Sequence, residues 1–118
     1  MTVVNEGAAD IADLIKTNYQ VVAIGDGRDT TSASQGGLNN FIFQKTGQVP
    51  TIVGSTLIYN VDFTGAQIPS SGVSEIGIFR NGTTAGNGTL LSRVTFTNTG
   101  VVASGDTVSF TIRVEVDN

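Results

Sequence analysis

The fold is decided by residues 73–96, which read VSEIGIFRNGTTAGNGTLLSRVTF. Two apolar runs, residues 75–79 and 90–96, flank a stretch rich in glycine, asparagine and threonine. Short apolar runs separated by such residues are typical of two β-strands joined by a loop. The segment therefore predicts a hairpin whose permissive loop, residues 81–89, extends into solvent.

Glu75 and Arg93 are the charged residues within the two predicted hairpin strands. Opposite charges on neighbouring strands stabilise a sheet, so we expect a cross-strand ion pair between them. A catalytic pair of carboxylates for glycoside hydrolysis would need a second acid, and only the distant Asp62 or Glu115 could supply it. The sequence therefore favours the structural ion pair.

Period-two alternation predicts two longer strands, at residues 56–63 and 108–116. The first places on one face Leu57, Tyr59, Val61 and Phe63. The second places on one face Val108, Phe110, Ile112, Val114 and Val116. Burial of each such side chain contributes roughly 1.5–3 kcal/mol, so a one-residue slip in strand register would be heavily penalised.

One helix is predicted at residues 6–17, after an extended arm at residues 1–5. Its apolar stripe, at helical spacing, comprises Ala8, Ile11, Ala12 and Ile15. Asn5 is placed to cap the first turn, and Asn18 to end the helix in the left-handed conformation. Because three to four turns are marginal alone, the helix is expected to lie on the sheets.

Residues 19–116 supply the predicted strands. Besides those already described, strands are expected at residues 19–25 and at 41–49, the latter at a sheet edge, with a long polar loop at residues 25–40 between them. About six strands and one helix predict a single mainly β domain over residues 1–118, an antiparallel β-sandwich or flattened barrel with one short N-terminal α-helix.

The composition excludes most enzyme classes. The 118-residue chain contains no histidine and no cysteine, which removes the usual general base, thiolate nucleophiles and the commonest metal ligands. The net charge is -4 and the six basic residues are scattered, so no surface for nucleic acid is expected. No apolar run approaches membrane-spanning length. We therefore expect a non-enzyme that needs no cofactor or metal and binds neither nucleic acid nor membrane.

Residues 23–31, which read AIGDGRDTT, raise two binding hypotheses. A phosphate loop would need a third glycine or a Gly-Lys-Ser/Thr triplet and a following helix, which the sequence lacks. A calcium loop at Asp26 and Asp29 lacks EF-hand spacing. We interpret Gly25 and Gly27 as turn residues that need glycine dihedral angles, and the two acids as acceptors of backbone N–H groups.

These features follow one another in a distinctive order. A helix leads into VVAIGDG, a polar loop containing GGL, an alternating strand, and then SGVSEIGIFRNG…GTLLSRVTF. This order resembles a family of small phage virion proteins and the N-terminal attachment domain of phage tail-collar fibres, which carries a VGDG-like turn and an I-x-E-I-G-L-F/Y…G-x-L-x-A/R hairpin. The matching positions are Ile24 to Gly27, Glu75 to Phe79, Gly88, Leu90, Leu91 and Arg93. The resemblance covers most of residues 5–116 and implies a non-enzymatic building block of a tailed-phage particle.

The resemblance leaves two virion positions open. Tail fibres continue into a shaft and a receptor-binding tip, whereas this chain stops within two residues of Val116, which favours a capsid decoration or cement protein. The resemblance itself favours a tail or baseplate adaptor that attaches a fibre. A carbohydrate-binding module is a weaker alternative, because such modules use aromatic platforms and this chain has no tryptophan. The expected location is the virion, after synthesis in the host cytoplasm.

The expected partners are virion proteins. A charged fraction of 14% is low beside the usual quarter and suggests surface covered by partners. We expect a homo-oligomer, a trimer by the resemblance, bound to major capsid or to tail and baseplate proteins. The arm and the loops at residues 25–40 and 80–89 have little apolar periodicity, so we expect docking to order them. The candidate interaction residues are Met1, Thr2, Val3, Val4, Asn5, Arg28, Asp29, Arg80, Asn81 and Asn87.

Overall fold

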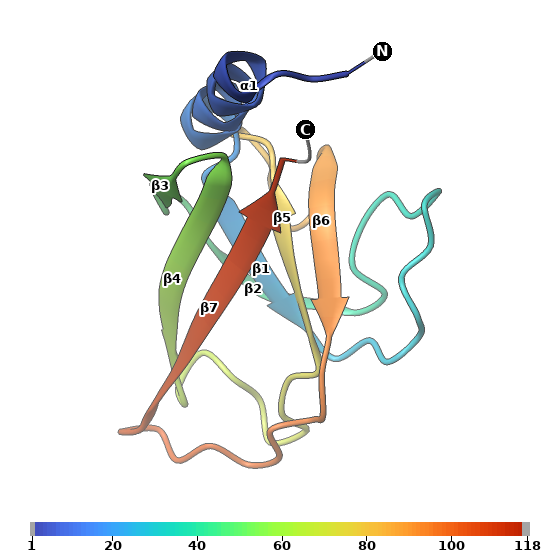
Figure 1. Cartoon of the computed structure of the whole chain (residues 1–118). Helices are drawn as coiled ribbons and strands as arrows, with labels where there is room; N and C mark the ends of the chain where they lie inside the picture. The colour runs from blue at the N-terminus through green and yellow to red at the C-terminus, as the bar shows by residue number, and fades with distance from the viewer. Residues whose placement is uncertain (1, 117–118) are drawn as a thin grey trace.

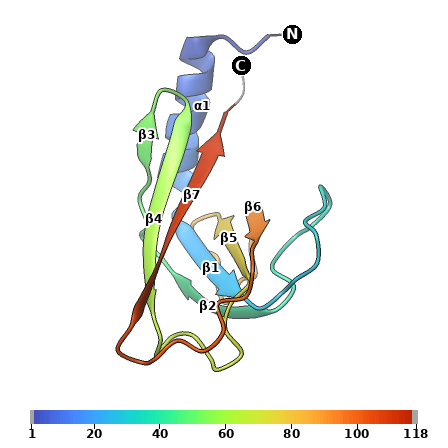
Figure 2. The ribbon, with the colours of Figure 1, turned by 60° about the horizontal axis from the view of Figure 1, so that its bottom comes forward.

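The computed structural model describes residues 2–116, which form one helix and seven strands in two antiparallel sheets (Figures 1 and 2). The elements are α1 (Asn5–Asn18), β1 (Val21–Gly25), β2 (Phe41–Lys45), β3 (Thr51–Val53), β4 (Thr56–Thr64), β5 (Glu75–Phe79), β6 (Leu90–Thr95) and β7 (Thr107–Glu115). One sheet has the strand order β2-β1-β5-β6 and the other β3-β4-β7. The predicted antiparallel sandwich with an N-terminal helix is confirmed.

The alternation in the two long strands sets the core. β4 pairs with β7 along nine positions, from Thr56 opposite Glu115 to Thr64 opposite Thr107. The inward side chains predicted for β4 are all buried, namely Leu57, Tyr59, Val61 and Phe63. In β7 only Ile112 of the predicted face is buried, and its neighbours on that face are half-buried. The face is predicted correctly, but burial along β7 is less complete than expected.

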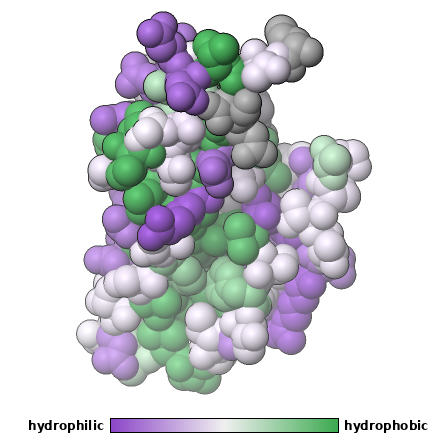
Figure 3. Space-filling view, viewed as in Figure 1, coloured by the Kyte–Doolittle hydropathy of each residue, from purple (hydrophilic) through white to green (hydrophobic). Residues whose placement is uncertain are grey.

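An open edge of the sandwich explains the partial burial along β7. β6 and β7 each end their sheet, and a groove of about 480 Å³ lies against both strands. Val94 pairs with the buried Ile76 but is 46% exposed, because the sandwich is open at this edge. Figure 3, which has the view of Figure 1, shows hydrophobic residues gathered on the lower half of the molecule, in the region of β7.

The strand count differs from the prediction by one short strand, β3. β3 pairs with the first residues of β4 across a tight turn at Gly54 and Ser55. Gly54 has a φ of 65°, a left-handed conformation that glycine adopts without strain. The pattern Thr-Ile-Val in β3 is too short for a period-two signal, so the sequence predicted only the second strand of this hairpin.

The helix is one residue longer at each end than predicted, and neither predicted cap forms. Val4 occupies the N-cap position and no side chain caps the first turn, while Asn5 lies inside the helix. Asn18 is the last helical residue and does not have a positive φ; its side-chain amide instead donates to the carbonyl of Leu14. Within residues 2–116 no helix has the length and apolar character needed to cross a membrane.

The prediction that one apolar stripe of α1 is buried is only partly correct. Ala8 and Ala12 are fully buried and Ile15 packs against the core, as predicted. Ile11, however, is 40% exposed. The helix contacts β3 and β4 at the end of the sandwich, and small alanines bring it close there (Figure 1). Only the face centred on these alanines is therefore covered.

Tyr59 ties the sheets to the segment between α1 and β1. Its hydroxyl donates to the carbonyl oxygen of Tyr19 at 2.7 Å, and burial raises the pKa of Tyr59 to about 12. We expect Tyr59→Phe to lower the free energy of unfolding by about 1 kcal/mol, because one buried hydrogen bond is lost. Tyr19→Phe is the matched control, since the Tyr19 hydroxyl makes no hydrogen bond within residues 2–116. Equal urea-unfolding curves for the two variants would contradict this role.

Candidate functional site

The predicted ion pair is present and fully buried. The Nε of Arg93 lies 2.8 Å from the Oε1 of Glu75, and both side chains are 0% exposed. Glu75 begins β5 opposite Thr95, and Arg93 lies opposite Gly77, so the two charged residues occupy diagonal positions on neighbouring strands. The predicted cross-strand ion pair between Glu75 and Arg93 is confirmed.

The Glu75 carboxylate also holds both ends of the loop at residues 25–40. The backbone N–H of Gly27 donates to Oε2 at 2.7 Å. At the far end of the loop, the N–H of Asn39 donates to Oε1 at 2.9 Å and that of Asn40 to Oε2 at 2.8 Å. With Arg93, four hydrogen bonds therefore converge on one buried carboxylate.

The two glycines of the Gly-Asp-Gly turn make room for this carboxylate. A Cβ at Gly25 or at Gly27 would overlap the Oε2 of Glu75. Neither glycine has a positive φ, so the expectation that this turn needs glycine dihedral angles is wrong. Glycine is required here because the loop backbone approaches a buried side chain closely.

Arg93 fixes the middle of the same loop. Its Nη1 donates to the carbonyl oxygen of Asp29 at 2.7 Å and to the hydroxyl of Thr31 at 2.9 Å. The Thr31 hydroxyl in turn donates to the carbonyl of Arg93 at 3.2 Å. Among residues 2–116, the Nη2 of Arg93 is the buried side-chain polar atom without a hydrogen-bond partner. One ion pair thus holds the loop at its start, middle and end.

A small second core lies under the loop. Val21, Ala23 and Phe79 are buried on the face of the first sheet that turns away from the second sheet. Partly buried side chains that pack against them are Leu38, Phe41 and Leu90. The loop tip, residues 28–34, is exposed and projects beside β6 (Figures 1 and 2). The loop is therefore a fixed base with a solvent-exposed polar tip.

Asp26 and Asp29 accept hydrogen bonds from side chains, not from backbone N–H groups as expected. Asp26 Oδ1 accepts from the amide of Asn98 at 2.9 Å and from the hydroxyl of Ser74 at 3.2 Å. Asp29 Oδ2 accepts from the amide of Asn39 at 3.2 Å. In the described part of the chain, no cluster of three or more acidic, histidine or cysteine side chains is arranged to hold a metal ion.

The structure places the candidate interaction residues in three regions. Arg28 and Asp29 lie on the exposed tip of the 25–40 loop, with the Arg28 side chain 67% exposed. Arg80 lies beside α1, whose N-terminal end carries the arm of Thr2, Val3 and Val4 followed by Asn5. Asn87 is exposed at the tip of the β5–β6 loop. Met1 lies outside the described residues.

The expectation that docking orders these loops is corrected by their internal hydrogen bonds. Glu75 and Arg93 hold residues 25–40, as described above. Asn81, a candidate contact residue, uses its side chain within the fold: its amide donates to the Thr17 carbonyl at 2.9 Å and its Oδ1 accepts from the Gln20 N–H at 2.8 Å. The loops are fixed by the chain itself.

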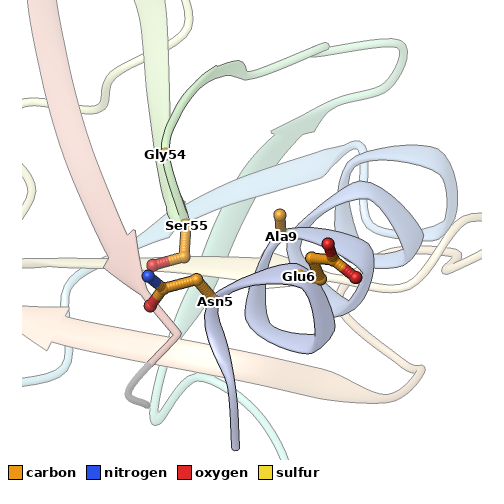
Figure 4. A pocket seen from close by; sticks show the side chains of 5 residues that line it. All are labelled: Asn5, Glu6, Ala9, Gly54 and Ser55. Atoms are coloured by element: carbon orange, nitrogen blue, oxygen red, sulfur yellow. The ribbon is translucent and has the colours of Figure 1, made fainter.

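A separate cleft of about 480 Å³ lies between the start of α1 and the β3–β4 turn (Figure 4). It is lined by Asn5, Glu6, Ala9, Gly54 and Ser55. A catalytic site needs a nucleophile or an acid–base group oriented by a second group. Glu6 is the one ionisable side chain in this lining, and Ser55 supplies the one hydroxyl group.

Comparison of the chain with models of protein families gives no match, and comparison with curated proteins gives none either.

Removal of the Glu75 charge is expected to cost more stability than any single hydrogen bond. Glu75→Gln leaves the Arg93 guanidinium buried without its counter-charge, and such a loss costs about 3–5 kcal/mol. Glu115→Gln removes an equal charge from an exposed position of β7 and is expected to leave the free energy of unfolding nearly unchanged. Urea unfolding measures both. Similar curves for the two variants would contradict the role of the pair.

Acid is expected to weaken the fold through Glu75. Burial raises the pKa of Glu75, but hydrogen bonds from Arg93 and from the backbone of Asn40, Asn39 and Gly27 outweigh burial and hold the pKa below 4.5. A lowered pKa in the folded state stabilises the fold above pH 4.5, and this stabilisation is lost as the pH falls through the folded pKa.

The wild-type protein should therefore lose more free energy of unfolding between pH 6 and pH 3, about the range in which carboxylates titrate, than Glu75→Gln loses. Urea titrations at each pH give this difference. Parallel pH dependences would show that Glu75 does not couple protonation to folding.

Proposed function

We propose that the chain is a non-enzymatic accessory structural protein of a tailed-bacteriophage particle, placed on the capsid surface as a decoration or cement protein. The observation that supports this proposal most directly concerns the residues that carry the resemblance to phage attachment domains. Four of these residues, Gly25, Gly27, Glu75 and Arg93, come from three separate segments of the sequence, yet they meet at the buried ion pair. The ion pair therefore explains why these four residue types occur together.

The use made of Glu75 supports a structural role. A catalytic carboxylate must reach a substrate, whereas this carboxylate is buried and accepts four hydrogen bonds from the protein. The chain has no histidine or cysteine to supply another general base or nucleophile. The site is suited to hold a loop rather than to transform a ligand.

The exposed loop tip supports docking to a large partner. Residues 28–34 are solvent-exposed and, apart from Ala33, polar, while hydrogen bonds from Arg93 to Asp29 and from Asn40 to Glu75 hold the loop. A pre-ordered loop loses little conformational entropy when it binds, which suits a protein that adds to an assembled particle. The partners in this proposal are the major capsid protein and further copies of the chain itself.

The alternative position is a tail or baseplate adaptor that attaches a fibre. The resemblance to the attachment domain of tail-collar fibres favours this position over the capsid. A carbohydrate-binding module is disfavoured, because all six phenylalanines and both tyrosines are buried or half-buried. Saccharide recognition through an exposed aromatic platform therefore has no support within this chain.

Labelling of virions tests the proposal. Antibodies raised against the purified chain are applied to phage particles whose genome encodes it, and bound gold is located by electron microscopy. Label spread over the capsid is the expected result, and label confined to the tail or baseplate would move the protein to the adaptor position. Purified virions that contain no peptide of this chain by mass spectrometry would overturn the virion proposal.

A further inference from the structure

Helix α1 carries two apolar faces, and the sandwich covers one of them. Ala8 and Ala12 are 0% exposed and face the sheets with Ile15. A second row follows at Val4, the N-cap residue, and at Gly7, Ile11 and Leu14 within the helix, and we call it the outer seam. Its large members are exposed: Val4 by 64%, Ile11 by 40% and Leu14 by 56%.

The outer seam has the spacing of a helix-pairing surface. Steps of three, four and three residues match the a and d positions of a heptad, at which apolar side chains pack into a neighbouring helix. Val4, Ile11 and Leu14 supply such side chains, and Gly7 leaves room for the neighbour to approach closely. Exposed large hydrophobic residues are otherwise scattered over the described chain, at Val49, Val53, Val94 and Val101. The other three lie on one short helix or at its N-cap, and this concentration points to a helical partner.

Charge differs on the two sides of the seam. One side of the helix carries the acids Glu6, Asp10 and Asp13. On the other side, a cleft of about 270 Å³ runs from Ile11 and Leu14 to Arg80, which forms no salt bridge within residues 2–116. A partner that matches this surface must bring negative charge to the Arg80 side and positive charge to the acidic side.

A second copy of the same helix meets both requirements in one orientation. When two identical helices pack face to face in parallel around a rotation axis, the acidic side of each lies against the Arg80 side of the next. In an antiparallel pair the acidic sides would meet each other, and like charges repel. The parallel arrangement also lets a ring of copies close.

We propose that the outer seam of α1 is the self-association surface of this protein, where it packs in parallel against the same helix of a neighbouring copy. Val4, Ile11 and Leu14 form the apolar contact, and Arg80 pairs across the contact with Asp10 of the neighbour. This inference rests on the self-association included in the proposed function, but not on the virion location.

Light scattering on the purified chain tests the surface. The wild-type protein should have the mass of two or three chains, and Leu14→Lys should have the mass of one with unchanged circular dichroism. Ala9→Lys is the matched control, because Ala9 is exposed on the opposite side of the helix. Wild-type protein that remains monomeric, or a Leu14→Lys variant that keeps the wild-type mass, would overturn the proposal.

A single cysteine tests the orientation, because the chain has none of its own. Parallel helices bring equivalent positions together, so Leu14→Cys should form a disulfide-linked dimer under mild oxidation. An antiparallel pair centred on the seam would separate these positions by about 15 Å, beyond the reach of a disulfide. Ala9→Cys should remain unlinked, and linkage of both variants to the same extent would refute a specific seam.

A charge exchange tests the Arg80 contact. Arg80→Glu should weaken self-association, and addition of Asp10→Arg should restore it; failure of the second change to restore the mass would remove this pair from the proposal. Virion labelling is independent of these masses. A capsid-bound protein with a monomeric solution form would refute the seam alone, and an oligomer absent from virions would refute the virion function alone.

Discussion

The buried ion pair between Glu75 and Arg93 is the interaction on which the surface architecture of this protein depends. Two charges with no solvent exposure are costly unless each is paired and hydrogen-bonded. Here the remaining capacity of the carboxylate is filled by backbone N–H groups of one loop. The cost of burying the charges is thereby offset, and a loop without secondary structure acquires a defined conformation.

The same pair explains a run of otherwise unrelated sequence features. Gly25 and Gly27 are small because the carboxylate occupies the space where their side chains would lie. Arg93 reaches the carbonyl of Asp29 and the hydroxyl of Thr31, which orders the loop between the glycines and Asn39. A polar surface is thus held in place by a buried centre.

The sequence predicted well those features that depend on local period. Alternation in β4 and β7 identified their inward faces, and one acid and one cation in a hairpin identified the ion pair. Local period could not predict that Glu75 binds the distant loop. The donors are backbone N–H groups, which every residue except proline has, so no residue type in the loop marks them. Ser74 and Asn98, which bind Asp26, were missed for a related reason: polar residues near turns suit many local roles.

For the helix, in contrast, the sequence pattern predicted more burial than the structure shows. Ile11 fits a stripe with Ala8, Ala12 and Ile15, yet the sheets cover only a narrow part of that stripe. The spacing of Val4, Ile11 and Leu14, seven and three residues apart, was present in the sequence, but a second apolar face becomes visible only when the first is known to be covered. Periodicity identifies apolar faces, and tertiary packing decides which of them remain free.

Amide hydrogen exchange by NMR tests the central claim most directly. If Glu75 and Arg93 fix the loop, the N–H groups of Gly27, Asn39 and Asn40 should exchange slowly in the wild-type protein. In Glu75→Gln they should exchange much faster relative to the amide of Ala23, which lies in β1 between β2 and β5. Rapid exchange of these loop amides in the wild type, or equal protection relative to Ala23 in both proteins, would contradict the account.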